Sequence, residues 1–124
     1  AVARFPNVAM DTAMVPSSAV VSAAMTAFGS GRILFGSDQP LHLIRSTVYE
    51  NPNLGQRLVT EYPYHWVDRS EQAQYGHLAK EGTHSIWQSL EAIRLGIDSM
   101  IPKWLIRDAK QKIFRDNARR FFEF

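Results

Sequence analysis

The stretch "RILFGSDQP", residues 32–40, places a carboxylate shortly after an apolar run that is typical of a buried strand. Asp38 ends this run, and Pro40 stops the strand from continuing. In α/β proteins the carboxyl end of a parallel strand borders the ligand crevice, and an ionised aspartate there needs donors or a cation such as a divalent metal. From spacing alone, the commoner use of an Asp-x-Pro aspartate is to cap a turn.

Two short strands and one helix must position this carboxylate. An apolar run at about residues 7–12 predicts a first strand that ends near Asp11, and residues 32–36 predict a second. Between them, Pro16 and two serines favour a helix start, and Gly29 favours its end. This pattern predicts two parallel strands with a right-handed crossover. Asp11 then lies on the same rim as Asp38, where a turn or cap role is commoner than a role in shaping a pocket.

The rest of the chain, after residue 41, is predicted to be mostly helical, so the fold class is α/β. Residues 41–49 are compatible with a short helix, and the proline- and glycine-containing residues 50–68 are expected to be irregular. From about residue 70 the apolar spacing predicts a long helix that Pro102 ends, followed by a last helix. The apolar positions are Ile86, Leu90, Ile93 and Ile97 in the first, and Ile106, Ala109, Ile113 and Phe121 in the second.

Three segments together carry a family resemblance. "NVAMDTA", "GSGRILFGSDQP" and "KQKIFRDNARRFF" resemble the C-terminal part of the amidohydrolase-related metal-dependent hydrolases, most specifically at the second strand and the last helix. The resemblance implies a (β/α)8 barrel of about 250 residues. Residues 1–124 would then be a single C-terminal portion of that barrel, with an insert at about 46–100 where the resemblance is absent. Because the chain begins with Ala1, we expect a processed chain or a piece of a longer one.

The resemblance also implies a role for Asp38. It corresponds to the strand-eight aspartate, a catalytic residue and metal ligand that takes a proton from the metal-bound water. The cofactor is a divalent metal, with zinc expected, in the complete barrel. The family's histidine ligands belong to strands that this chain does not match, so the chain alone is expected to be inactive and to need the missing ligands to complete its metal site. Within the family, both hydrolysis and metal-dependent non-oxidative decarboxylation occur. A non-catalytic helical interaction module is the third alternative.

Three further side chains are candidates for substrate binding. His42 and Arg45 follow the second strand and are suited to an anionic substrate group, although solvated or structural roles are at least as common. His65 lies in the aromatic stretch "EYPYHWVD", which is suited to a lid over a barrel mouth. A loop packed on its own protein is the favoured interpretation there, because large aromatic side chains mostly serve packing.

His77, Glu81 and His84 form a separate candidate for a metal site. On a helix, their spacings of four and three residues place them on one face, as zinc ligands can be. Gly82 weakens a helix here. An exposed polar helix is therefore the favoured interpretation.

Composition limits the partners. The net charge of +2 is too small to indicate a polyanionic partner, and the absence of cysteine fits a reducing, cytoplasmic location. We expect a small-molecule substrate, no nucleic acid and no membrane. The basic last helix also fits a nucleic-acid- or membrane-binding protein, but a solvated outer face is favoured. Two parallel strands cannot form a finished sheet, so self-association or association with the missing barrel portion is expected.

Overall fold

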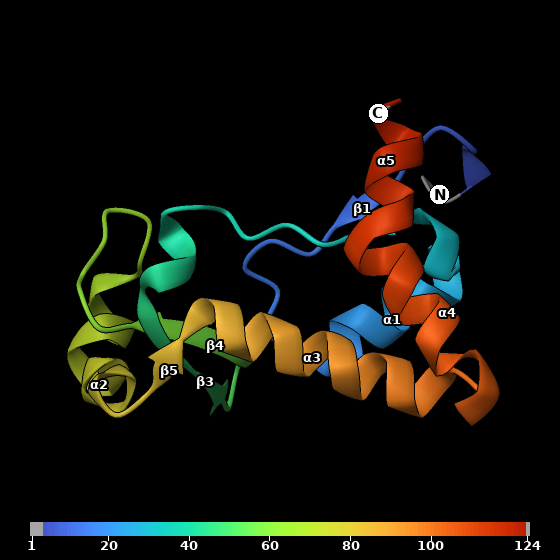
Figure 1. The fold of residues 1–124 in the computed structure, drawn as a ribbon. Coiled ribbons are helices and arrows are strands. Elements are labelled where there is room, and N and C mark those ends of the chain that lie inside the picture. The colour runs from blue at the N-terminus through green and yellow to red at the C-terminus, as the bar shows by residue number, and fades with distance from the viewer. Residues whose placement is uncertain (1–3, 124) are drawn as a thin grey trace.

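The computed structural model describes residues 4–123, in which a layer of helices covers a short pair of strands and a hairpin lobe extends to one side (Figure 1). Strand β1 (Met10–Asp11) pairs in parallel with β2 (Ile33–Leu34), and helix α1 (Ser18–Phe28) connects them. The predicted strand–helix–strand unit is therefore confirmed. Its strands are shorter than the predicted ranges 7–12 and 32–36, because only these residue pairs form the ladder.

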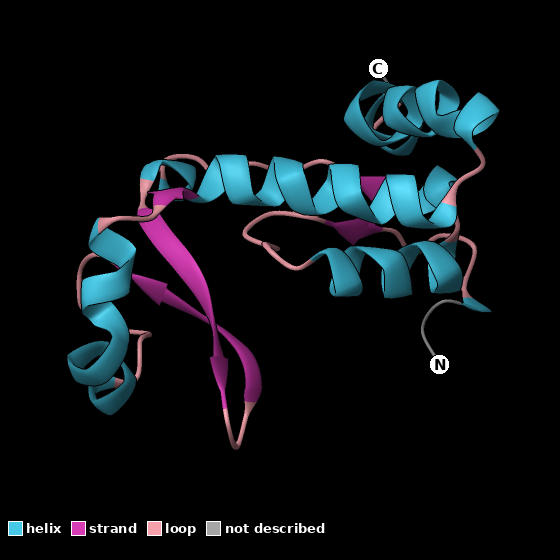
Figure 2. Cartoon of the chain, turned by 90° about the horizontal axis from the view of Figure 1, so that it is seen from below, coloured by secondary structure: helices cyan, strands magenta, loops and turns pink. Residues whose placement is uncertain are grey.

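The hairpin corrects the prediction for residues 41–60. Strand β3 (Arg45–Asn51) pairs antiparallel with β4 (Gly55–Thr60), where a short helix and an irregular segment were expected (Figure 2). The Asn51 side chain accepts hydrogen bonds from the backbone N–H groups of Asn53 and Leu54, at 2.9 and 3.0 Å, and thereby forms the turn. Pro52, which indicated a loop in the sequence, lies in the hairpin turn, and Gly55 begins β4 directly after it.

The long helix predicted from residue 70 is two helices. Helix α2 (Arg69–Lys80) ends before Gly82, the two-residue strand β5 (Thr83–His84) follows, and α3 (Ser85–Met100) begins directly after it. Strand β5 pairs with β3, which brings the Ser46 carbonyl against Gly82. A Cβ atom at Gly82 would lie 2.2 Å from that carbonyl oxygen, so the close approach requires glycine. The break in the helix is therefore set by a strand that is distant in sequence.

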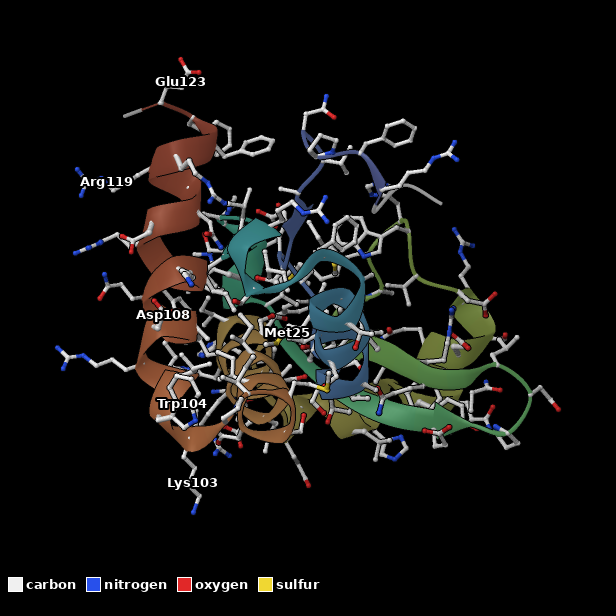
Figure 3. All side chains as sticks on the ribbon, turned by 90° about the vertical axis from the view of Figure 1, so that its right-hand side faces the viewer. Met25, Lys103, Trp104, Asp108, Arg119 and Glu123 are labelled. Carbon is white, nitrogen blue, oxygen red and sulfur yellow. The ribbon has the colours of Figure 1, made fainter. Side chains whose placement is uncertain are left out.

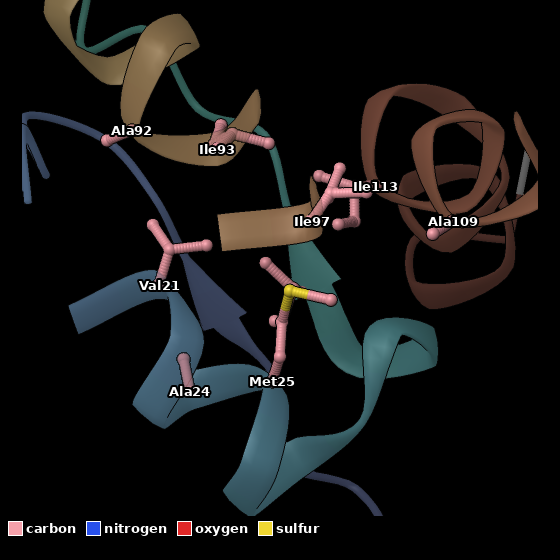
Figure 4. Close-up of a cluster of buried hydrophobic side chains, with 9 residues drawn as sticks. Val21, Ala24, Met25, Ala92, Ile93, Ile97, Ala109 and Ile113 are labelled. Atoms are coloured by element: carbon pink, nitrogen blue, oxygen red, sulfur yellow. The ribbon is translucent and has the colours of Figure 1, made fainter. Parts of the chain in front are cut away.

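Two hydrophobic clusters hold the helices in place. The main cluster joins α1, β2 and α3 to the last helical segment, which consists of α4 (Ile106–Gln111), a π-helical stretch (Lys112–Asp116) and α5 (Asn117–Phe121) (Figure 4). Ile93, Ile97 and Ile113 are at most 1% exposed, as their spacing predicts, whereas Phe121 is 47% exposed and does not belong to the predicted stripe. A smaller cluster packs α2 on the hairpin through Tyr49, Val59, Tyr75 and Ala79.

The last helical segment also closes the free edge of β2. The buried Asn117 amide donates to the carbonyl oxygens of Ser30 and Ile33, at 2.7 and 2.8 Å. The Phe35 N–H donates to the Ile113 carbonyl at 3.1 Å. Ile113 lies in the π-helical stretch, where the wider turn disturbs the regular helical hydrogen bonds and lets a carbonyl bond outward. Groups of this helix, rather than another strand, therefore occupy the edge.

Among residues 4–123, no helix is long and apolar enough to cross a membrane.

Candidate functional site at the strand ends

The carboxyl ends of β1 and β2 meet at one rim of the fold. Just beyond β1, Thr12 is fully buried and donates from both its N–H and its hydroxyl to the Leu34 carbonyl, at 3.0 and 3.1 Å. These two bonds hold the chain after β1 in register with the end of β2. The segments that leave the two strands therefore start side by side, as expected for a parallel pair.

Asp11 and Gly36 make the closest contact on this rim. One Asp11 carboxylate oxygen accepts the Ala13 N–H at 2.6 Å, which confirms the predicted turn role. A Cβ atom at Gly36 would lie 2.3 Å from both carboxylate oxygens of Asp11, closer than atoms can approach. A side chain at position 36 would therefore require the Asp11 carboxylate to move, because this carboxylate lies directly against the segment that leads to Asp38.

Asp38 lies in the exposed loop beyond β2, four residues after the strand ends. Its backbone has a φ of 54°, in the left-handed region that aspartate tolerates better than most residues. Its carbonyl accepts the His42 N–H at 3.2 Å, but among the described residues nothing donates a hydrogen bond to its carboxylate. The side chain is not a turn cap, so the interpretation favoured by spacing alone is wrong. A carboxylate at this rim is available to a ligand.

The three predicted substrate-binding side chains are placed differently. His42 lies in a 3-10 turn (Leu41–Leu43) close to Asp38 in sequence, and its Nδ1 atom is buried without a hydrogen-bond partner in the described part of the chain. The Arg45 guanidinium donates to the Gly82 carbonyl at 3.2 Å, which ties it to the connection between α2 and β5. His65 is exposed in the loop between β4 and α2, and its ring contacts Trp66 edge-on.

The loop that carries His65 forms an aromatic stack. The rings of Tyr64 and Trp66 lie nearly parallel, at 8°, with centroids 4.7 Å apart, and Tyr62 meets Tyr64 edge-on. Trp66 is 52% exposed and Tyr62 is 60% exposed. The aromatic side chains pack on one another, in line with the favoured prediction, but leave much of their surface in solvent. Within residues 4–123, the ring contacts of this loop join its own side chains to one another.

His77, Glu81 and His84 do not form a metal site. They lie in α2, at its C-terminal end and in β5, on three different elements rather than on one helix face. Within the described residues there is no group of three or more His, Asp or Glu side chains that could hold a metal ion. The rim carries the carboxylates of Asp11 and Asp38, with His42 nearby in sequence, and these side chains can occupy only some of the positions around a divalent cation, which leaves the others to further ligands.

Perturbed carboxyl groups lie away from this rim. Asp68 accepts hydrogen bonds from the Ser70 and Glu71 N–H groups at the start of α2. The Ser70 side chain, followed by these backbone groups, holds the pKa of the Asp68 carboxyl below its ordinary value. The pKa of Glu91 is lowered by its hydrogen bonds with Arg94, and that of Asp116 by Arg115. These shifts arise from capping and surface ion pairs, and they do not mark a catalytic centre.

Comparison with protein-family models gives a match over the whole chain. A model described as amidohydrolase matches residues 1–124. The chain belongs to the amidohydrolase family. Comparison with curated proteins and with solved structures gave no match. The resemblance inferred from the two strand segments and the last helix is thus confirmed, and the match extends through residues 46–100, where the sequence motifs gave no resemblance.

Sequence reasoning named the main rim residues of this amidohydrolase but not how they fit together. Asp11 was singled out in the sequence and Gly36 was not, and nothing in their spacing of 25 residues shows that they touch. Thr12 was not singled out, although its hydroxyl bonds the end of β2. A threonine directly after a short apolar strand is a weak signal, because its hydroxyl can equally bond its own turn.

Proposed function

We propose that this amidohydrolase-family chain is the C-terminal portion of a metal-dependent hydrolase barrel, with an insert at about residues 46–100, and that it supplies Asp38 to the active site. The observation that carries the proposal is the Asp38 carboxylate itself. It is exposed, it follows a parallel strand, and none of residues 4–123 hydrogen-bonds it. A family that uses a carboxylate at this position gives such a side chain a chemical role.

In the proposed site, Asp38 is one ligand of a divalent metal, with zinc the expected ion. When bound, the ion lowers the pKa of a water molecule and polarises the bond to be cleaved. Asp38 takes the proton from the attacking water and later returns it to the leaving group. The remaining ligands come from outside the described residues, because these hold no group of three or more side chains that could hold a metal ion. The substrate is a small molecule.

Thermal unfolding in the presence of divalent metals tests this proposal. A ligand that binds only the native state raises the melting temperature. Zinc, cobalt and manganese are added to the chain combined with the portion of the barrel that supplies the remaining ligands. We expect a metal-dependent increase that Asp38→Asn removes. Asp108→Asn is the matched control, because that exposed carboxylate pairs with Lys112 in the helical segment that begins with α4, away from the strand ends. An equal increase in both variants, or none in the wild type, contradicts the proposal.

A second function has one observation in its favour. The free edge of β2 is closed by Asn117 and Ile113, so the chain covers a strand edge that a barrel would pair with another strand. This arrangement suits a helical interaction module without catalysis. If the chain is such a module, added divalent metal should not raise its melting temperature, and the chain should stay folded without bound metal.

A further inference from the structure

The corner between α3 and α4 exposes an unusual combination of side chains. Pro102 ends the connection from α3, and a 3-10 turn (Lys103–Leu105) leads into α4. Trp104 in this turn is 79% exposed, more than any other large apolar side chain in residues 4–123. Figure 3 shows Lys103 and Trp104 at one end of the column formed by α4 and α5, on the side away from Met25 in the core. A tryptophan in this position contributes little to the packing of its own chain.

A hollow of about 730 Å³ adjoins this turn. Lys103, Arg107 and Lys110 line it, at spacings of four and three residues that bring them to one face of the helical segment. Ile106 lies between them, and Asp98 of α3 closes one side. The hollow therefore combines an apolar surface with three cations.

These three cations differ from their neighbours in the same helical segment. Lys112 pairs with Asp108 at 2.6 Å, and Arg115 pairs with Asp116 at 2.7 Å. Within the described part of the chain, Lys103, Arg107 and Lys110 form no ion pair, and the Asp98 carboxylate beside them is already bonded to Arg94 at 3.0 Å. Among the described residues Asp98 is the one carboxylate that lines the hollow, so the three cations there outnumber the acidic groups.

Charge is also segregated along the chain. Residues 101–124 hold half of the 14 Lys and Arg residues but only three of the 12 Asp and Glu residues. The hairpin and helices α2 and α3, residues 45–100, hold five Lys and Arg and seven Asp and Glu. An acidic partner is therefore attracted to the corner, and a long polyanion that also passes over residues 45–100 is repelled there.

We propose that this basic corner (Lys103, Trp104, Ile106, Arg107 and Lys110) docks an acidic segment of another protein. Such a segment presents an apolar side chain to Trp104 and Ile106, and carboxylates to the three cations. A hollow fits a protruding side chain better than a flat lipid surface. Buried aromatic and arginine side chains are also the residues that most often dominate protein–protein binding energy. The inference does not depend on the metal site proposed for Asp38.

Fluorescence anisotropy with a labelled probe tests the docking. The probe is a short synthetic peptide of alternating glutamate pairs and single leucines, and a second peptide with glutamine in place of glutamate is its control. We expect saturable binding of the acidic peptide that weakens as salt rises. Lys103→Gln, Arg107→Gln and Lys110→Gln combined should weaken binding by roughly tenfold or more, because three facing charges are lost. Trp104→Ala should weaken it as well.

The matched control carries the same loss of charge at another place. Lys112→Gln, Arg115→Gln and Arg119→Gln combined remove three cations of the same helical segment and should leave the affinity within about twofold. Equal weakening by both triple variants, or binding of the glutamine peptide as tight as that of the acidic one, overturns the proposal. So does tighter binding of a short DNA duplex, or of phosphatidylserine-containing vesicles, because either result identifies a different class of partner. The single change Arg107→Gln at an exposed position repeats the test with minimal disturbance of folding.

Discussion

Replacing Gly36 by alanine probes the contact that sets the rim of the strand pair. The added methyl group would lie 2.3 Å from both Asp11 carboxylate oxygens, so one of the two side chains must move. Asp11 is the more mobile partner, but it is held by the 2.6 Å hydrogen bond from the Ala13 N–H. Relief of the clash therefore has a cost, either in backbone displacement or in the loss of this bond.

The expected loss of stability follows from these two ways of relieving the clash. Forcing an extra methyl group into an occupied space costs about 1–3 kcal/mol. Rotating the Asp11 side chain away forfeits a hydrogen bond worth about 0.5–1.5 kcal/mol. The chain takes the cheaper route, so we expect Gly36→Ala to lower the free energy of unfolding by about 0.5–1.5 kcal/mol. For a chain of this length the melting temperature should fall by roughly 2–6 °C.

Thermal and urea unfolding of four variants test this expected loss of stability. Gly31→Ala is the matched control, since a Cβ atom there meets only the Arg120 side chain, at 3.8 Å, and should be nearly neutral. Asp11→Ala removes the obstacle, so the double variant with Gly36→Ala should lose less stability than the sum of the two single changes. Additive losses, or wild-type stability of Gly36→Ala, would refute the reasoning.

Three further predictions concern the elements that hold the rim. Asn117→Ala leaves two carbonyl groups at β2 without donors and should cost about 1–3 kcal/mol in urea unfolding. Ile97→Ala empties the main core and should cost about 2–5 kcal/mol, whereas Leu54→Ala, at a position 64% exposed, should stay within about 0.5 kcal/mol. Asp68→Ala removes the cap of α2. Because the native pKa of Asp68 is lowered, the stability gap to wild type should be full above the ordinary pKa of 3.8 and close as pH falls through the native value.

Local signals predicted the parts of the fold that depend on local chemistry. Helix α1 starts after Pro16 and two serines and ends at Gly29, where the sequence places its boundaries. The burial of Ile93 and Ile97 follows from their helical spacing. These features need only neighbouring residues, so they can be predicted from the sequence.

Features that depend on distant residues could not be predicted. Pro52 and Gly55 indicate a loop equally well whether or not two strands pair around them, so the hairpin was missed. The division of the long helix at Gly82 depends on a carbonyl group of β3. Spacing favoured Asp38 as a turn cap, but only the path of its loop shows that the backbone carbonyl serves the turn and leaves the carboxylate unbonded.

The central claim is that Asp38 is a metal ligand, and metal content tests it most directly. The protein is purified under native conditions together with the barrel portion that supplies the remaining ligands, and its metals are measured by mass-spectrometric elemental analysis. We predict about one divalent ion per copy of the chain, as in mononuclear hydrolytic sites, lost in Asp38→Asn and retained in Asp108→Asn. A protein without a divalent ion, or an Asp38→Asn variant with unchanged metal content, would contradict the account.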